Sequence, residues 1–338
     1  MQKKIKNDKK HYGIAITATI VLILIMYWIF RDSWPKICTQ ILNARKIPLL
    51  LLVLLGNIYI FLDGLVLRYM IKRNGEPCSI GEAIHLAYMV VFFNVTTFAA
   101  GTKPAQIYYL YEHNKTAPGK SFGMLTMEYV SHKLTIVLYA ALMFCIYRTP
   151  ILKTLKSSSS YLLAGFGISI VVLSFLTAFC VNDRLAPWLS DLCRRIKKET
   201  WRQKAQKIMK QMEEFSKAGR MVLRDKKGWM GLIVRNILKM SCLYLLPATA
   251  AYAVTGERLP LSAGACVAYA AVMQLLIGVI PSSGGTGSTE IVFMLLFKDM
   301  LGKTSCGAAL ILYRMATYYL PFLVSIPLVL AGKKAVKH

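Results

Sequence analysis

Charged residues are scarce in this sequence, and acidic residues are scarcest of all. Of its 338 residues, 17% are charged and 56% are hydrophobic, whereas a water-soluble chain carries about 25% charged residues. That deficit excludes an ordinary soluble domain with a solvated surface. The charges are separated by apolar stretches of roughly 20 residues, the length that crosses a hydrocarbon core. We therefore expect an all-α integral membrane protein.

Histidines and paired cysteines are also lacking. The chain has five His, and its eight Cys are scattered without a CxxC pair, which argues against a metal site or a disulfide framework. HExxH, GxSxG and Asp-rich metal motifs are missing, and so is the Gly-Lys-Ser/Thr of a P-loop. The sequence thus predicts no catalytic set, no metal and no cofactor.

Negative charge is outnumbered, with 16 Asp and Glu against 42 Lys and Arg. The basic residues flank apolar spans, as the positive-inside rule describes, so we expect anionic membrane lipids as partners and no nucleic acid. Residues 182–228 hold 14 Lys and Arg against 6 Asp and Glu. This excess places the loop in the cytoplasm, together with both termini of a multi-pass cell-membrane protein.

The apolar segments predict a polytopic helical bundle. Two regions, 80–120 and 262–301, are interrupted by Gly and Pro, and we expect each to be a re-entrant broken-helix hairpin. The first would enter from the cytoplasm and the second from outside, which keeps the loop 182–228 inside. Full spans are expected at 12–30, 47–71, 121–148, 161–181, 229–255 and 307–332.

Opposite-facing hairpins suggest two inverted repeats, a recurring design of transporters. At an offset of 181, Gly75 falls on Gly256 and Lys133 falls on Arg314. The expected organisation is a basic tail with a first transmembrane helix (1–44), a first repeat with an extra helix (45–181), a basic amphipathic cytoplasmic loop (182–225) and a second repeat (226–338). The apolar stripe of that loop suits packing on the protein's own cytoplasmic face or on anionic lipid.

Charged side chains inside membrane spans mark candidate functional residues, because each costs about 2.5–3.5 kcal/mol on insertion scales. Basic side chains would hold a phosphate, while carboxylates would hold a cationic headgroup or balance the bases. Alternatively, the charges only pair and lock the helices together. His85 and Lys239 are weaker candidates. The expected headgroup site comprises Asp63, Lys103, Gln106, Glu128, His132, Lys133, Gly284, Gly285, Gly287, Glu290 and Arg314.

Two stretches carry a resemblance to a known family. Pro281 to Glu290 resembles the Pro-x-Pro-Gly-Gly-x-Gly-x-x-Glu signature of the lysylphosphatidylglycerol synthase transmembrane-region family, with Ser283 in place of the second Pro. Tyr313 to Pro321 is similar to that family's Arg-containing final helix. A looser match runs from Phe93 to Tyr109, and Glu128-Tyr129 resembles the helix that follows.

The resemblance implies a flippase that moves a phospholipid, foremost aminoacylated (lysyl-) phosphatidylglycerol, and that confers resistance to cationic peptides. In two-domain members a soluble domain transfers lysine from lysyl-tRNA. This chain ends at His338, so we expect that activity only with a separately encoded transferase as partner. Three alternatives stay open: a phosphatidylglycerol lysyltransferase or its membrane subunit, a transporter of polyprenyl-linked glycolipid, and a non-transporting scaffold that docks partners on the basic loop. A homodimer is an assembly that the sequence leaves open.

Overall fold

The computed structural model describes residues 34–97, 101–155, 159–181, 217, 225–256, 262–278 and 287–335. Every regular element in these ranges is a helix, as the composition predicts. The elements in chain order are α2 (Trp34–Leu42), α3 (Lys46–Arg73), α4 (Ile80–Thr96), α5 (Thr102–Asn114), α6 (Pro118–Ile146), α7 (Arg148–Leu155), α8 (Ser159–Val181), α11 (Lys226–Thr255), α12 (Ala263–Ile277), α13 (Ser288–Leu301), α14 (Lys303–Arg314), η3 (Met315–Tyr319) and α15 (Leu320–Ala335).

Four helical segments are long and apolar enough to cross a membrane. They are α3, α6, α11 and the continuous run Lys303–Val329, and they confirm four of the six expected spans. Leucines such as Leu50, Leu54, Leu138 and Leu238 are exposed along them, as suits a lipid-facing surface. The expected span 12–30 lies outside the described residues, and 161–181 falls within the 23-residue helix α8.

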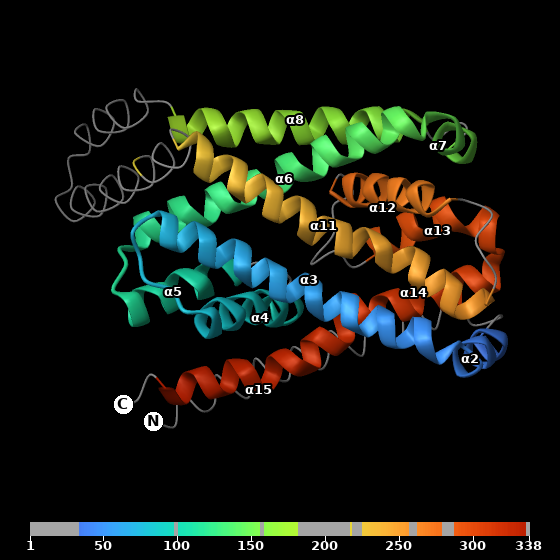
Figure 1. Cartoon of the computed structure of the whole chain (residues 1–338), viewed down its shortest axis with the longest axis horizontal. Helices are drawn as coiled ribbons and strands as arrows, with labels where there is room; N and C mark the ends of the chain where they lie inside the picture. Colours follow the sequence, from blue (N-terminus) through green and yellow to red (C-terminus); the bar gives the residue numbers. More distant parts are fainter. Residues whose placement is uncertain are drawn as a thin grey trace, which may run out of the picture.

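Four other helices are too short to span a membrane alone. Helices α4, α5, α12 and α13 have 17, 13, 15 and 14 residues, which correspond to about 20–26 Å, whereas a hydrocarbon core is about 30 Å thick. They pack as two consecutive pairs, α4 with α5 and α12 with α13. The pairs lie toward opposite ends of the longest axis (Figure 1).

Between the two pairs, α3 and α11 run side by side and pack extensively against each other (Figure 1). Small residues let neighbouring backbones approach α3 closely. A Cβ added to Gly56 would lie 2.5 Å from the carbonyl oxygen of Ala316 in η3, and one added to Gly64 would lie 3.1 Å from the carbonyl oxygen of Ala83 in α4. Helix α3 is thereby held between the last span and the first short pair.

The last span departs from the single uninterrupted helix expected over 307–332. It begins at Lys303, and residues Met315–Tyr319 form a π-helix that divides it. Segments of π-helix are rare and are frequent at functional sites, because the extra residue redirects side chains. Here the π-helix follows directly after Arg314, which the charge pattern had singled out.

Candidate headgroup-binding cavity

Two adjoining chambers lie between the short helical pairs. One, of about 410 Å³, is lined by Lys133, Lys103, Glu128 and Lys239 among others, and we call it the Lys133 chamber. The other, of about 300 Å³, is lined by Arg314, and we call it the Arg314 chamber. Both are of the size of small-molecule sites. They form one cavity because the following residues line both: Tyr59, Asp63, Val90, Asn94 and His132.

Helices α3 and α11 contribute the first charged pair of this cavity. The Lys239 ammonium donates to Asp63 Oδ1 at 2.7 Å, and the Lys239 side chain is almost wholly buried. Asp63 interrupts an apolar stretch of α3, and Lys239 interrupts one of α11. An unpaired charge at such depth is costly, and pairing the two side chains offsets part of that cost. Lys239, a weaker candidate from the sequence, is thus part of the cavity wall.

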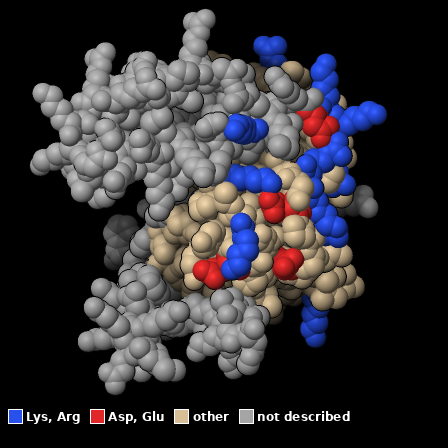
Figure 2. Space-filling view, turned by 90° about the vertical axis from the view of Figure 1, so that its left-hand side faces the viewer, with Lys and Arg blue, Asp and Glu red and all other residues tan. Residues whose placement is uncertain are grey.

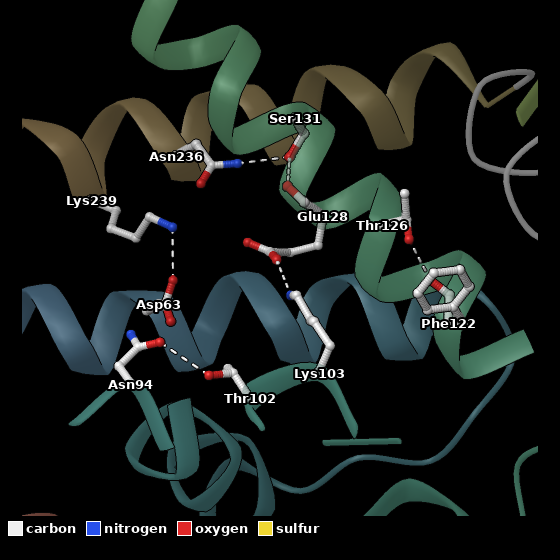
Figure 3. Close-up of polar contacts among 10 residues, drawn as sticks. All are labelled: Asp63, Asn94, Thr102, Lys103, Phe122, Thr126, Glu128, Ser131, Asn236 and Lys239. Atoms are coloured by element: carbon white, nitrogen blue, oxygen red, sulfur yellow. Dashed lines mark hydrogen bonds and ion pairs between the residues drawn. The ribbon is translucent and has the colours of Figure 1, made fainter. Parts of the chain in front are cut away.

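The second charged pair joins α5 to α6 and is looser. Lys103 Nζ lies 3.4 Å from Glu128 Oε2, and the two side chains are 35% and 10% exposed. Figure 3 shows both reaching into the space between α3 and α6, near the Lys239–Asp63 pair. The start of α5 is held to α4 by Thr102, whose hydroxyl lies 3.0 Å from Asn94 Oδ1. Lys103, the next residue, therefore enters the cavity from the first turn of α5.

The third charged pair joins α13 to α14 and is closely packed. Arg314 Nε and Nη2 both lie 2.7 Å from Glu290 Oε1, and the side chains are 7% and 8% exposed. Glu290 Oε2 also accepts a hydrogen bond from the Gly287 amide at 2.7 Å. Gly287 has φ of +84°, a conformation that favours glycine. The backbone amide of Gly287, one of the expected headgroup-site residues, is thus occupied by the protein's own carboxylate.

Three further expected residues line the Lys133 chamber, and each has a polar atom without a hydrogen-bonded partner among the described residues. Among the described residues, Lys133 has no carboxylate within 4 Å, and its ammonium lies 5.7 Å from the ring centroid of Tyr129. An added Cβ at Gly278 would lie 3.3 Å from Lys133 Nζ, which places this ammonium at the end of α12. Within the part of the chain that the structure describes, neither amide atom of the fully buried Gln106 has a hydrogen-bond partner, nor has Nδ1 of His132. Buried polar groups of this kind call for a ligand or water.

Comparison with known protein families identifies the chain. The sequence model described as "Lysylphosphatidylglycerol synthase TM region" matches residues 12–325. The chain belongs to this family. No curated protein matches it significantly. Three residues of the stretches that carry the resemblance, Asn94, Glu128 and Arg314, line the cavity.

Within this family member, most of the expected site residues meet in one place. Asp63, Lys103, Gln106, Glu128, His132, Lys133 and Arg314 line the chambers, and Glu290 is bonded to Arg314. Gly287 caps the helix that carries Glu290. Gly284 and Gly285 lie outside the described residues. Outside the cavity, His85 stacks near Tyr109, with ring centroids 5.0 Å apart.

The sequence reasoning missed two polar residues, Tyr59 of the cavity wall and Asn236, which precedes the wall residue Lys239 on α11. Tyr59 lies one helical turn before Asp63 and lines both chambers. Asn236 lies three residues before Lys239 and donates to the buried Ser131 hydroxyl at 2.9 Å. In both cases the signal was available, because polar residues three or four apart share one face of a helix. A search for polar pairs at that spacing within apolar segments finds both.

Proposed function

We propose that the protein is a lipid translocase of the cell membrane that carries a phospholipid headgroup through the cavity, foremost that of aminoacylated (lysyl-) phosphatidylglycerol. The observation that carries this proposal is the charged cavity between α3, α6 and α11, inside a bundle with an apolar exterior. Its ammonium and guanidinium groups suit a phosphate, and its carboxylates suit an amine. A polar headgroup can cross the membrane along a path where cavity water and polar side chains take the place of bulk water around it.

The proposal includes an inverted repeat with two re-entrant hairpins. In support, a long helix, two short helices and a long helical segment follow each other twice, as α3 to α6 and as α11 to α15. The short pairs lie toward opposite ends of the molecule (Figure 1), which is compatible with entry from opposite sides of the membrane. Broken helices that meet at the bilayer midplane are the usual place of a transporter's site. Rocking of one repeat against the other would expose the cavity to each leaflet in turn.

The orientation that we propose has the end with the α3 C-terminus in the cytoplasm. Lys72 and Arg73 form the last turn of α3, and Lys and Arg predominate on the described part of this end (Figure 2). The loop 182–228, with 14 Lys and Arg, belongs to the same side by the positive-inside rule. These charges would also bind anionic lipid headgroups.

Leaflet-resolved lipid analysis tests the proposal. Cells with and without the gene are compared, using a membrane-impermeant amine label for surface aminoacyl phospholipid and extraction for the total. We expect loss of the gene to lower the surface fraction and leave the total unchanged. A fall in the total would instead support a lysyltransferase or its membrane subunit, acting with a soluble partner. If both values are unchanged, aminoacyl lipid is not the substrate, and polyprenyl-linked glycolipid becomes the next lipid to test.

A further inference from the structure

The Lys103–Glu128 pair differs from the other two charged pairs in a way that bears on ligand binding. Its 3.4 Å separation exceeds the 2.7 Å of the Lys239–Asp63 and Arg314–Glu290 contacts. Charge-assisted N–H···O bonds are normally about 2.7–2.9 Å long. Lys103 is also the most exposed of these six side chains, at 35%. A long lysine stem with partial access to water can leave its partner at little cost.

The chamber around this pair has a surplus positive charge and buried polar groups without a hydrogen-bond partner among the described residues, and a ligand could bind both. Three lysines (Lys103, Lys133 and Lys239) line it against two carboxylates (Asp63 and Glu128), so with His132 neutral the wall carries one surplus positive charge. Lys133 is the cation without a carboxylate partner among the described residues. The Gln106 amide, three residues after Lys103 and therefore on the same side of α5, offers a buried donor and a buried acceptor.

We propose that Glu128 is an amine-binding subsite, which the Lys103 ammonium occupies when no substrate amine is present. The proposal rests on the function proposed above and assigns the parts of the headgroup to residues. The ammonium of the headgroup takes the place of Lys103 at Glu128, with the Gln106 carbonyl oxygen as a second acceptor. Lys103 turns away, and Lys133 binds the phosphodiester. Ligand charge then selects between two positions of Lys103.

Charge balance explains why Lys103 would control specificity. A phosphodiester headgroup without an amine has one negative charge and neutralises the wall while Lys103 stays on Glu128. An amine-bearing headgroup brings positive charge, so Lys103 must leave the carboxylate for the amine to bind. Lys103 therefore competes with amines and not with phosphate. Removing its charge should favour amine-bearing lipids, whereas removing the charge of Glu128 should disfavour them.

A comparison of two lipids of nearly equal size tests this assignment. The full chain is reconstituted into vesicles that contain acyl-chain-labelled lysylphosphatidylglycerol or its N-acetylated form, which lacks the amine charges. Translocation is followed by quenching the label in the outer leaflet. The measured quantity is the ratio of the two rates. Binding of short-chain versions of the same lipids to the detergent-solubilised protein, measured by thermal shift, gives a second ratio that does not require transport.

We expect Lys103→Met to raise both ratios about threefold to fivefold, which is the effect of removing a competing ion pair at the strength of a partly exposed one. Glu128→Gln should lower both ratios about tenfold or more, because the amine loses its counter-charge. Lys72→Met is the matched control, since Lys72 is an exposed lysine on α3 away from the cavity, and it should leave the ratios as in the wild type.

The outcomes separate this inference from the proposed function. If the wild type translocates both lipids and neither ratio responds to Lys103→Met or Glu128→Gln, the amine subsite is wrong while the translocase stands. If the wild type translocates neither lipid but binds the amine-bearing one in a way that Glu128→Gln abolishes, the subsite stands and the translocase is wrong. If the wild type shows neither translocation nor amine-dependent binding, both are overturned.

Discussion

The two halves of the membrane domain each join their second short helix to the following long helix by an ion pair, but with opposite polarity. In the first half α5 supplies the cation, Lys103, and α6 supplies Glu128. In the second half α13 supplies the anion, Glu290, and α14 supplies Arg314. The first pair is long and one-third exposed on the lysine side, whereas the second is short, buried and tied to the Gly287 amide. One arrangement thus produces a releasable contact and a fixed one.

The difference has a physical origin in the side chains and their surroundings. Arg314 presents two N–H groups to one carboxylate oxygen, and the guanidinium stays charged when buried. Glu290 lies in the first turn of α13, where the helix dipole favours a carboxylate. Lys103 lies in the first turn of α5, where the same dipole disfavours a cation. The second pair is therefore stabilised by its helix, while the first is opposed by it.

The largest effect that we expect is from Arg314→Ala. It leaves Glu290 buried without its counter-charge, and breaking such a pair costs about 3–5 kcal/mol. Thermal unfolding in detergent should detect this loss, and translocation should be abolished. Because the side chains of the pair are only 7% and 8% exposed, this variant should lose stability as well as transport.

A matched double variant separates stability from transport. Arg314→Met combined with Glu290→Gln removes both charges and keeps a group that can accept the Gly287 amide. We expect stability to return close to the wild-type value while translocation stays lost. Transport by this double variant at the wild-type rate would show that the pair is structural only, as the alternative interpretation of the intramembrane charges holds.

A smaller effect is expected from Gly56→Ala, which tests whether the π-helix after Arg314 is held in place by α3. The added Cβ would lie 2.5 Å from the Ala316 carbonyl oxygen, so helix α3 and η3 must separate. Overpacking of this kind costs about 1–3 kcal/mol, measured as a lower unfolding temperature. Gly167→Ala is the control, because nothing lies within 4 Å of its added Cβ. Equal behaviour of the two variants would contradict a tight contact.

Lys103→Met should have a smaller effect on stability than either change above. Exposed ion pairs contribute about 0–1 kcal/mol, and this pair lies nearer to that class than the Arg314–Glu290 pair does, because its contact is longer and Lys103 is 35% exposed. Unfolding temperatures of this variant and Arg314→Ala, measured side by side, give the contrast between the halves directly. A loss for Lys103→Met as large as that for Arg314→Ala would show that the first pair is no more releasable than the second.

The sequence predicted the elements of this fold better than it predicted their contacts. Length and hydropathy located α3, α6 and α11, and the Gly and Pro interruptions located the short pairs. Asp63 and Glu128 were found because an isolated charge in an apolar stretch can be recognised from the sequence alone. Partner choice was not visible, since Lys239 and Asp63 are 176 residues apart. The π-helix was not predicted either. Its residues occur in ordinary α-helices, and its close packing against Gly56 of α3 is a tertiary contact that the sequence does not reveal.

The smallest expected effect concerns an ion pair outside the apolar spans, between Arg73 at the end of α3 and Asp225 at the start of α11. Asp225 Oδ1 accepts from Arg73 Nη2 at 2.8 Å and from the Gly228 amide at 2.9 Å. The Arg73 guanidinium, with that amide, lowers the pKa of Asp225 below its ordinary value. Both side chains of this pair are substantially exposed. The pair therefore serves as the weakest of the ion pairs whose contributions to stability are compared.

The sign of its pH dependence follows from that lowered pKa. Above the ordinary Asp pKa of about 3.9, Asp225 is ionised in both the folded and the unfolded chain, and its stabilising contribution is fully present. As the pH falls, the unfolded chain binds the proton first, so the contribution is lost toward the lower pKa of the folded state. The unfolding temperature of Asp225→Asn should therefore lie below that of the wild type at neutral pH and approach it in acid. A difference that stays constant across this range would show that the carboxylate charge contributes nothing, and that the cap on α11 acts through its geometry.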